Sequence, residues 1–112
     1  MDLHELMAAL GEIERAAHDF INAPADTAPE QHLLEVLRRR NGMLNEPYGF
    51  EPGTDALRSR VWTDCMTILS NLELAPQHAA GQQSDLVRTQ VQKLSTLIEG
   101  LLELVRQLAE KR

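Results

Sequence analysis

The chain has 112 residues, of which 43% are apolar and 25% charged, a length and composition that fit one globular domain. Seventeen acidic residues against eleven basic ones give a net charge of −6, the wrong sign for a broad phosphate-binding face, which argues against nucleic acid as a partner. No apolar run is long enough to span a bilayer, and no basic segment precedes an apolar stretch near Met1, so we expect a cytoplasmic protein without membrane contact. The single cysteine, Cys65, excludes an internal disulfide.

The residue types are those of a helical protein. Leucine, alanine, glutamate and arginine are frequent, aromatic residues make up only 4%, and no alternating β-branched run appears. Apolar spacing predicts four helices, at about residues 3–22, 28–41, 55–74 and 85–111. We therefore expect a single all-α domain over residues 1–112, an antiparallel four-helix bundle whose long last helix is coiled-coil-like.

The first predicted helix has a single apolar stripe. Its apolar residues are three and four positions apart, and they are Leu3, Leu6, Leu10, Ile13, Ala17 and Phe20. Asp2 is placed to cap the helix together with Glu5, and the connection at residues 22–26 contains Pro24.

The second predicted helix begins with a capping pair, Thr27 and Glu30, and ends at Asn41 and Gly42. Residues 43–53 follow, with two prolines, two glycines and two of the four aromatic residues, so we expect no regular element there. The third helix starts near Thr54 and Asp55. A flexible polar connection at residues 77–83 then leads to Ser84, the expected cap of the last helix.

The last predicted helix repeats apolar residues at the core positions of a heptad pattern. Valine and isoleucine alternate with leucine in a way typical of two-stranded coiled coils, and we call these residues the seam: Val91, Leu94, Ile98, Leu101, Val105 and Leu108. Leu97, Leu102 and Leu104 make the apolar face wider than one seam. The seam is either buried within its own bundle or exposed to a second copy or another protein. We favour a homodimer, with the three flanking leucines facing the chain's own helices.

Two further groups are candidate partner contacts. Tyr48 and Phe50 either cover the helix ends as a lid or anchor another protein. Arg38, Arg39 and Arg40 either contact a partner or compensate the dipole of their own helix and pair with Glu35 and Asp55.

Catalytic and metal-binding patterns are weak. His18 falls at an outer helix position and Glu14 on the flank of the apolar stripe, while His32 and Glu35 lie on the polar side of the second helix, so we expect all four to be solvated surface residues. Cys65 falls on an apolar stripe and is interpreted as a small buried side chain. We therefore expect no enzyme activity, no cofactor and no metal.

These patterns favour a non-enzymatic protein-binding regulator, an anti-activator or chaperone-type adaptor that acts as a homodimer through apolar helix surface. The alternative is a nucleic-acid-associated regulator in which a dimer joins two Arg38–Arg40 patches, and the charge of −6 argues against it.

Overall fold

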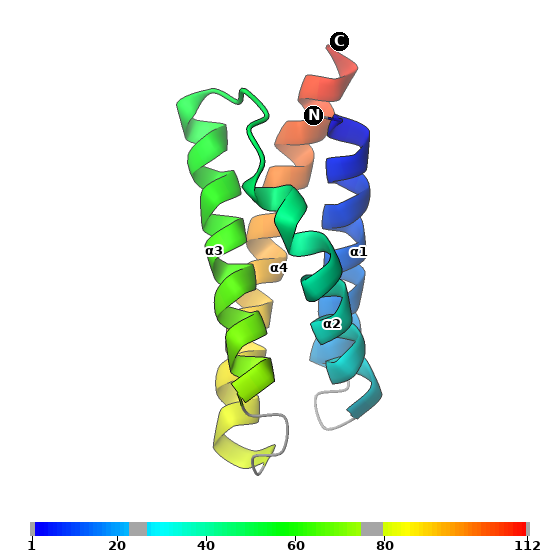
Figure 1. Ribbon diagram of the computed structural model, residues 1–112, viewed down its shortest axis with the longest axis vertical. Coiled ribbons are helices and arrows are strands. Elements are labelled where there is room, and N and C mark those ends of the chain that lie inside the picture. Colours follow the sequence, from blue (N-terminus) through cyan, green and yellow to red (C-terminus); the bar gives the residue numbers. More distant parts are fainter. Residues whose placement is uncertain (1, 23–26, 75–79, 112) are drawn as a thin grey trace.

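The computed structural model describes residues 2–22, 27–74 and 80–111, and within these ranges it contains helices and no strand. The elements are α1 (Leu3–Asn22), α2 (Thr27–Arg40), the 3-10 helix η1 (Asn41–Asn45), α3 (Pro52–Leu74) and α4 (Ala80–Glu110) (Figure 1). The all-α prediction is thereby confirmed for the described residues. None of the described helices is long and apolar enough to cross a membrane.

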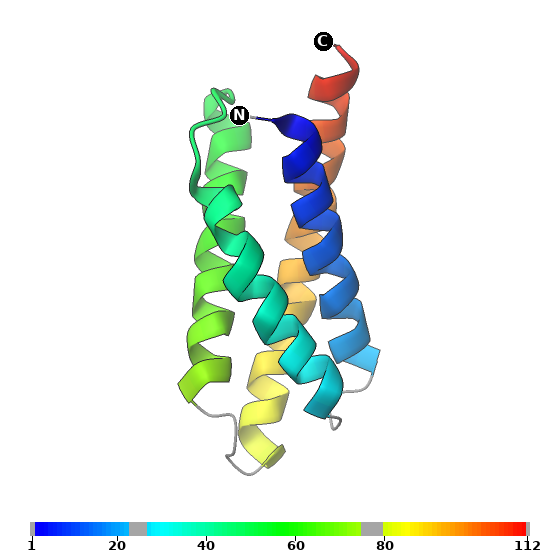
Figure 2. The same ribbon diagram turned by 45° about the vertical axis from the view of Figure 1, so that its right-hand side comes forward.

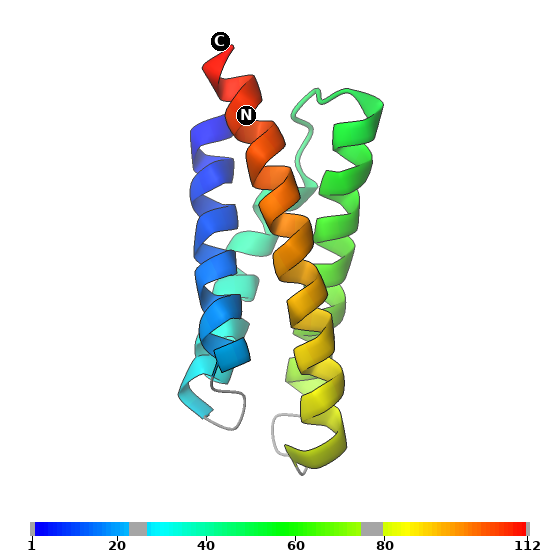
Figure 3. The ribbon, with the colours of Figure 1, turned by 180° about the vertical axis from the view of Figure 1, so that it is seen from behind.

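The helices form an elongated bundle of about 47 × 20 × 20 Å. α1 packs most extensively against α4, and α3 packs against the other side of α4 (Figure 3). α2 lies across the opposite face, on α1 and α3 (Figure 2). This packing is that of a bundle, whereas the antiparallel order of the helices and the coiled-coil character of α4 stay predictions.

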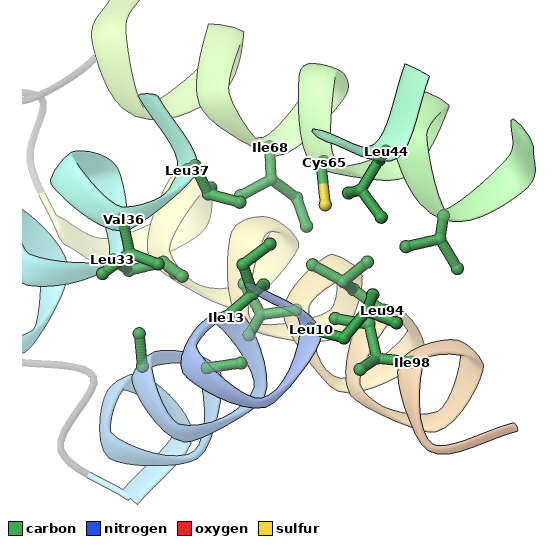
Figure 4. Close-up of a cluster of buried hydrophobic side chains, with 14 of the residues drawn as sticks. Leu10, Ile13, Leu33, Val36, Leu37, Leu44, Cys65, Ile68, Leu94 and Ile98 are labelled. Atoms are coloured by element: carbon green, nitrogen blue, oxygen red, sulfur yellow. The ribbon is translucent and has the colours of Figure 1, made fainter. Parts of the chain in front are cut away.

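The core is built from the apolar stripes of all four helices. All six residues of the predicted α1 stripe are buried, and Asp2 caps that helix by accepting a hydrogen bond from the N–H of His4 at 2.8 Å. Leu10 and Ile13 of α1 meet Leu94 and Ile98 of α4 in the cluster that Figure 4 shows. The other labelled members of this cluster come from α2, η1 and α3, and they are Leu33, Val36, Leu37, Leu44, Cys65 and Ile68.

The seam lies inside this core. Five of its six residues are fully shielded by the chain's own helices, and only Leu108 is half-buried. Leu97, Leu102 and Leu104, which we expected to face inward, are the half-buried flanks instead. The prediction that the seam faces a second copy, while Leu97, Leu102 and Leu104 face the chain's own helices, is therefore wrong. Because α1 and α3 both pack on α4, they cover its most continuous apolar stripe, which removes the most apolar area from water.

Two helix starts differ from the sequence-based boundaries. α3 begins at Pro52 rather than near Asp55, since proline fits the first helical position, where an N–H is not needed. The carbonyl of Glu51 accepts the first helical hydrogen bond, from the N–H of Asp55 at 2.8 Å. α4 begins at Ala80, within the segment expected to be a flexible connection.

The segment predicted to lack regular structure is partly helical. η1 occupies Asn41–Asn45, and its Leu44 is fully buried, which anchors this short helix to the core. Arg58 of α3 donates a hydrogen bond to the Leu44 carbonyl at 2.5 Å. Residues 23–26 and 75–79 of the predicted connections lie outside the described residues, as do the side chains of the expected caps Thr27 and Ser84.

Candidate functional site

Four polar side chains converge where α1 packs against α4. Glu14 and His18 are one helical turn apart on α1, and Ser95 and Glu99 are one turn apart on α4. The His18 Nε2 atom lies 3.3 Å from Ser95 Oγ and 3.9 Å from Glu99 Oε1. One donor atom from each of Glu14, His18 and Glu99 lies within 4.8 Å of the other two. We call these four residues the polar cluster.

The Glu14 side chain is the least exposed of the three ionisable side chains in the polar cluster. Its Oε2 atom is shielded from solvent and has no hydrogen-bond partner among the described residues. Burial raises the pKa of Glu14, the negative charge of Glu99 raises it further, and His18 lowers it. The polar cluster therefore combines an imidazole with two carboxylates, one of which lacks a compensating donor.

Two of the four residues of the polar cluster, Glu14 and His18, were singled out from the sequence, but both were expected to be solvated surface residues. The side chain of His18 is 54% exposed, as predicted, whereas Glu14, also expected to be solvated, is half-buried, and the side chain of Glu99 is 61% exposed. Ser95 and Glu99 were not singled out, because only the packing of α4 on α1 brings them to Glu14 and His18. One signal was present: Ser95, Glu99 and Glu14 each directly follow a core residue and so border a buried stripe. His32 and Glu35 are exposed, as predicted.

A pocket of about 260 Å³ lies beside the polar cluster along the same pair of helices. It is lined by Met7 of α1 and by Glu99, Leu102, Glu103 and Arg106 of α4. Met7 and Leu102 are half-buried and pack against the core, while the three charged residues are exposed. We call this pocket the α1/α4 groove. It shares Glu99 with the polar cluster.

The arginines at the end of α2 are paired with carboxylates of neighbouring helices. Arg40 Nε donates to Glu12 Oε1 of α1 at 2.7 Å, and Arg39 pairs with the same carboxylate. Arg38 lies 3.5 Å from Glu73 of α3. The hydrogen bond from Arg40 is the main reason why the pKa of Glu12 is lowered. These contacts tie α2 to α1 and α3 and offset the positive charge of the patch.

The prediction that these arginines pair with Glu35 and Asp55 is wrong. Glu35 is exposed, and Asp55 accepts a hydrogen bond from Arg58 at 2.8 Å instead. The reason is that α2 packs across α1 and α3, which brings the carboxylates of Glu12 and Glu73 within reach of its last turn.

Tyr48 and Phe50 form a lid against the core. Tyr48 is 8% exposed, and its hydroxyl donates a hydrogen bond to the carbonyl of Met43 at 2.6 Å. The two rings stack with centroids 5.3 Å apart, and Gly49 between them has a φ of 71°, which glycine adopts without strain. Burial raises the pKa of Tyr48. The lid alternative is supported, and the Tyr48 ring is not available as an exposed anchor.

Cys65 is fully buried among apolar residues, as predicted (Figure 4). Burial raises the pKa of its thiol to about 12, so the reactive thiolate is not populated at neutral pH. This side chain packs as a small hydrophobic group.

A smaller hollow of about 130 Å³ lies between α3 and α4, lined by Asp64, Thr67, Ile68, Gln90 and Lys93. The Oδ2 atom of Asp64 is shielded there and has no hydrogen-bond partner among the described residues.

Comparison of the chain with protein-family models, with curated proteins and with solved structures gives no match.

Proposed function

We propose that the chain is a non-enzymatic, cytoplasmic protein-binding adaptor of the regulator or chaperone type, which holds a helix of its partner in the α1/α4 groove. The observation that carries this proposal is the groove itself, where half-buried Met7 and Leu102 lie beside exposed charged residues. An apolar centre with a charged edge is the usual composition of a protein-binding site.

The extension of the groove along two neighbouring helices suits a partner helix. Pockets for small molecules typically enclose about 300–1,000 Å³, and this one has about 260 Å³ and opens along two helices. A partner helix would place apolar side chains, one turn apart, against Met7 and Leu102.

The charge of the groove favours a basic partner. Glu99 and Glu103 carry two negative charges against the single positive charge of Arg106, which already pairs with Glu103. The whole chain has a net charge of −6. A basic amphipathic helix would complement both the groove and the overall charge, and this complementarity would speed its association.

The proposal includes the antiparallel order of the bundle. The support is the order in which residues of α1 and α4 meet. Met7, near the start of α1, lines the groove with Leu102 and Arg106, whereas His18, later in α1, contacts Ser95, which comes earlier in α4. Moving forward along one helix therefore means moving backward along the other.

The homodimer through the seam, expected from the heptad pattern, has no support in the packing of this chain. A dimer through the seam would have to expose five fully buried residues of the core. No observation favours the alternative of nucleic-acid binding, because Arg38, Arg39 and Arg40 each already face a carboxylate.

The groove is tested with a display library of helical peptides that range from strongly basic to strongly acidic. Peptides selected on the wild-type chain are then measured against Leu102→Glu, which places a charge in the groove. The matched control is Leu34→Glu, another half-buried leucine that packs against the core, but on α2. We expect basic amphipathic peptides that bind the wild type and Leu34→Glu and are lost with Leu102→Glu. Selection of acidic peptides, or equal binding by Leu102→Glu, would contradict the proposal.

A further inference from the structure

The polar cluster presents the donor atoms of a metal site. Imidazole nitrogen and carboxylate oxygen are both ligands of Zn²⁺ and of neighbouring transition metals. We propose that Glu14, His18 and Glu99 together bind one divalent transition-metal ion of the Zn²⁺ class, held between α1 and α4. This site is separate from the partner-binding function proposed above, although Glu99 also lines the α1/α4 groove.

The distances fit an ion after small side-chain movements. Ligands about 2.1 Å from a tetrahedral ion lie about 3.4 Å from one another. The three donor atoms already lie within 4.8 Å of one another, and the His18 Nε2 to Glu99 Oε1 distance is 3.9 Å. The side chains of His18 and Glu99 are 54% and 61% exposed, so packing leaves them room to rotate toward an ion.

The backbone already places the ligands for binding. Glu14 and His18 are four residues apart on α1, which directs both side chains to the same face of the helix. α4 supplies the third ligand from a helix that is fixed by the core residues Leu94, Ile98 and Leu101. Little chain entropy is therefore lost when the three ligands meet around an ion.

A second, independent observation is the shielded Oε2 atom of Glu14. A carboxylate oxygen that is removed from water without a donor costs folding free energy, and the described residues provide no donor for this one. The neighbouring carboxylate of Glu99 adds a like charge. A bound cation would offset the negative charge of both carboxylates, including the one that is partly removed from water.

The donor set selects among the common divalent ions. Ca²⁺ prefers about six to eight oxygen ligands and Mg²⁺ an octahedral oxygen shell, which this cluster does not supply. One imidazole with two carboxylates suits Zn²⁺ and its neighbours in the first transition row, and three protein ligands leave a fourth position for water. Coordination through His18 Nε2 would replace the present contact of this nitrogen with Ser95 Oγ at 3.3 Å, and would free the hydroxyl to hydrogen-bond such a water.

The test is isothermal titration of the chelator-treated full chain with Zn²⁺, and with Mg²⁺ and Ca²⁺ as comparison ions. We expect one Zn²⁺ per chain, and an affinity at least about tenfold weaker in His18→Ala, His18→Gln, Glu99→Gln and Glu14→Gln. The chain offers a matched control, because His32 and Glu35 are an exposed histidine and glutamate on α2. His32→Ala and Glu35→Gln are expected to bind Zn²⁺ as the wild type does.

Thermal unfolding gives a second measurement on the same samples. Zn²⁺ is expected to raise the Tm of the wild type and of the His32→Ala control, and to raise the Tm of His18→Gln by less at the same Zn²⁺ concentration, since a ligand that binds only the folded state stabilises it in proportion to its affinity. The proposal is overturned if the wild type takes up no Zn²⁺, if the His32→Ala control loses as much affinity as His18→Ala, or if Ca²⁺ and Mg²⁺ bind as tightly as Zn²⁺. Circular dichroism of each variant establishes that the fold is retained.

Discussion

Arg40 Nε donates a hydrogen bond to Glu12 Oε1 at 2.7 Å, and this contact joins the last turn of α2 to the middle of α1. Arg39 reaches the same carboxylate. Glu12 therefore holds two guanidinium groups that the sequence had suggested as partner contacts, and these arginines have a structural role in the bundle.

Glu12→Gln is expected to destabilise the protein at neutral pH by about 1 kcal/mol or less, as for other partly exposed ion pairs. Because the pKa of Glu12 is lowered in the folded chain, its stabilising contribution is complete above the ordinary value of 4.5 and is lost as the pH falls through the lowered pKa. Urea unfolding of the wild type and Glu12→Gln should therefore differ at pH 7 and converge in acid. Glu35→Gln, at an exposed position, is the control, and an equal loss in both variants would refute the assignment.

Glu14→Gln is expected to have the opposite effect, measured in the presence of a chelator. The raised pKa of Glu14 means that its ionised form opposes folding at neutral pH, and that this penalty disappears as the pH falls through the raised pKa and below 4.5. Removing the charge should therefore raise the Tm at pH 7, with a gain that shrinks in acid. A lower Tm of Glu14→Gln at pH 7 would contradict the conclusion that burial of this carboxylate opposes folding.

Ile98 tests whether the seam is core or interface. Ile98→Ala should cost about 2–5 kcal/mol of stability, as for other fully buried aliphatic residues, and Ile98→Asp should fail to fold. Leu86→Ala, at a leucine on the same helix that is 56% exposed, should change stability by about 0.5 kcal/mol or less. Circular dichroism and light scattering measure both effects. If Ile98→Asp instead folds and its solution mass is half that of the wild type, the seam is a dimer interface and not part of the core.

Cys65 is expected to resist thiol reagents in the folded protein. Full burial blocks access, and a pKa of about 12 leaves almost no thiolate at pH 8. A chromogenic disulfide reagent should label the native chain only slowly and the urea-unfolded chain at once. Equal rates in both states would mean that the α3 face around Cys65 opens readily.

Local patterns in the sequence predict most of the fold. All six residues predicted for the α1 stripe are buried, because a single helix with one buried face leaves a simple period in the sequence, and the prediction missed only the small residues Ala9 and Ala16 on the same face. The start of α3 was missed because Pro52 suits both a loop and a first helical turn. η1 was missed because one buried residue, Leu44, fixes it through tertiary contacts.

The candidate sites depend on information that a local pattern does not contain. The seam was found correctly as an apolar stripe, but the same stripe forms whether the covering helix belongs to this chain or to another. Likewise, the spacing of Glu14 and His18 was visible, whereas their meeting with Glu99 depends on the register between α1 and α4. The partners of Arg38 and Arg40, Glu73 and Glu12, are also distant in sequence.

The most direct test of partner binding in the α1/α4 groove is to map backbone amide chemical shifts while a selected basic amphipathic peptide is titrated into the isotope-labelled full chain. The account predicts that the shifts concentrate around Met7 of α1 and residues 99–106 of α4, and leave Arg38–Arg40 and Tyr48 nearly unchanged. Shifts centred on α2 or on the Tyr48–Phe50 lid would contradict it.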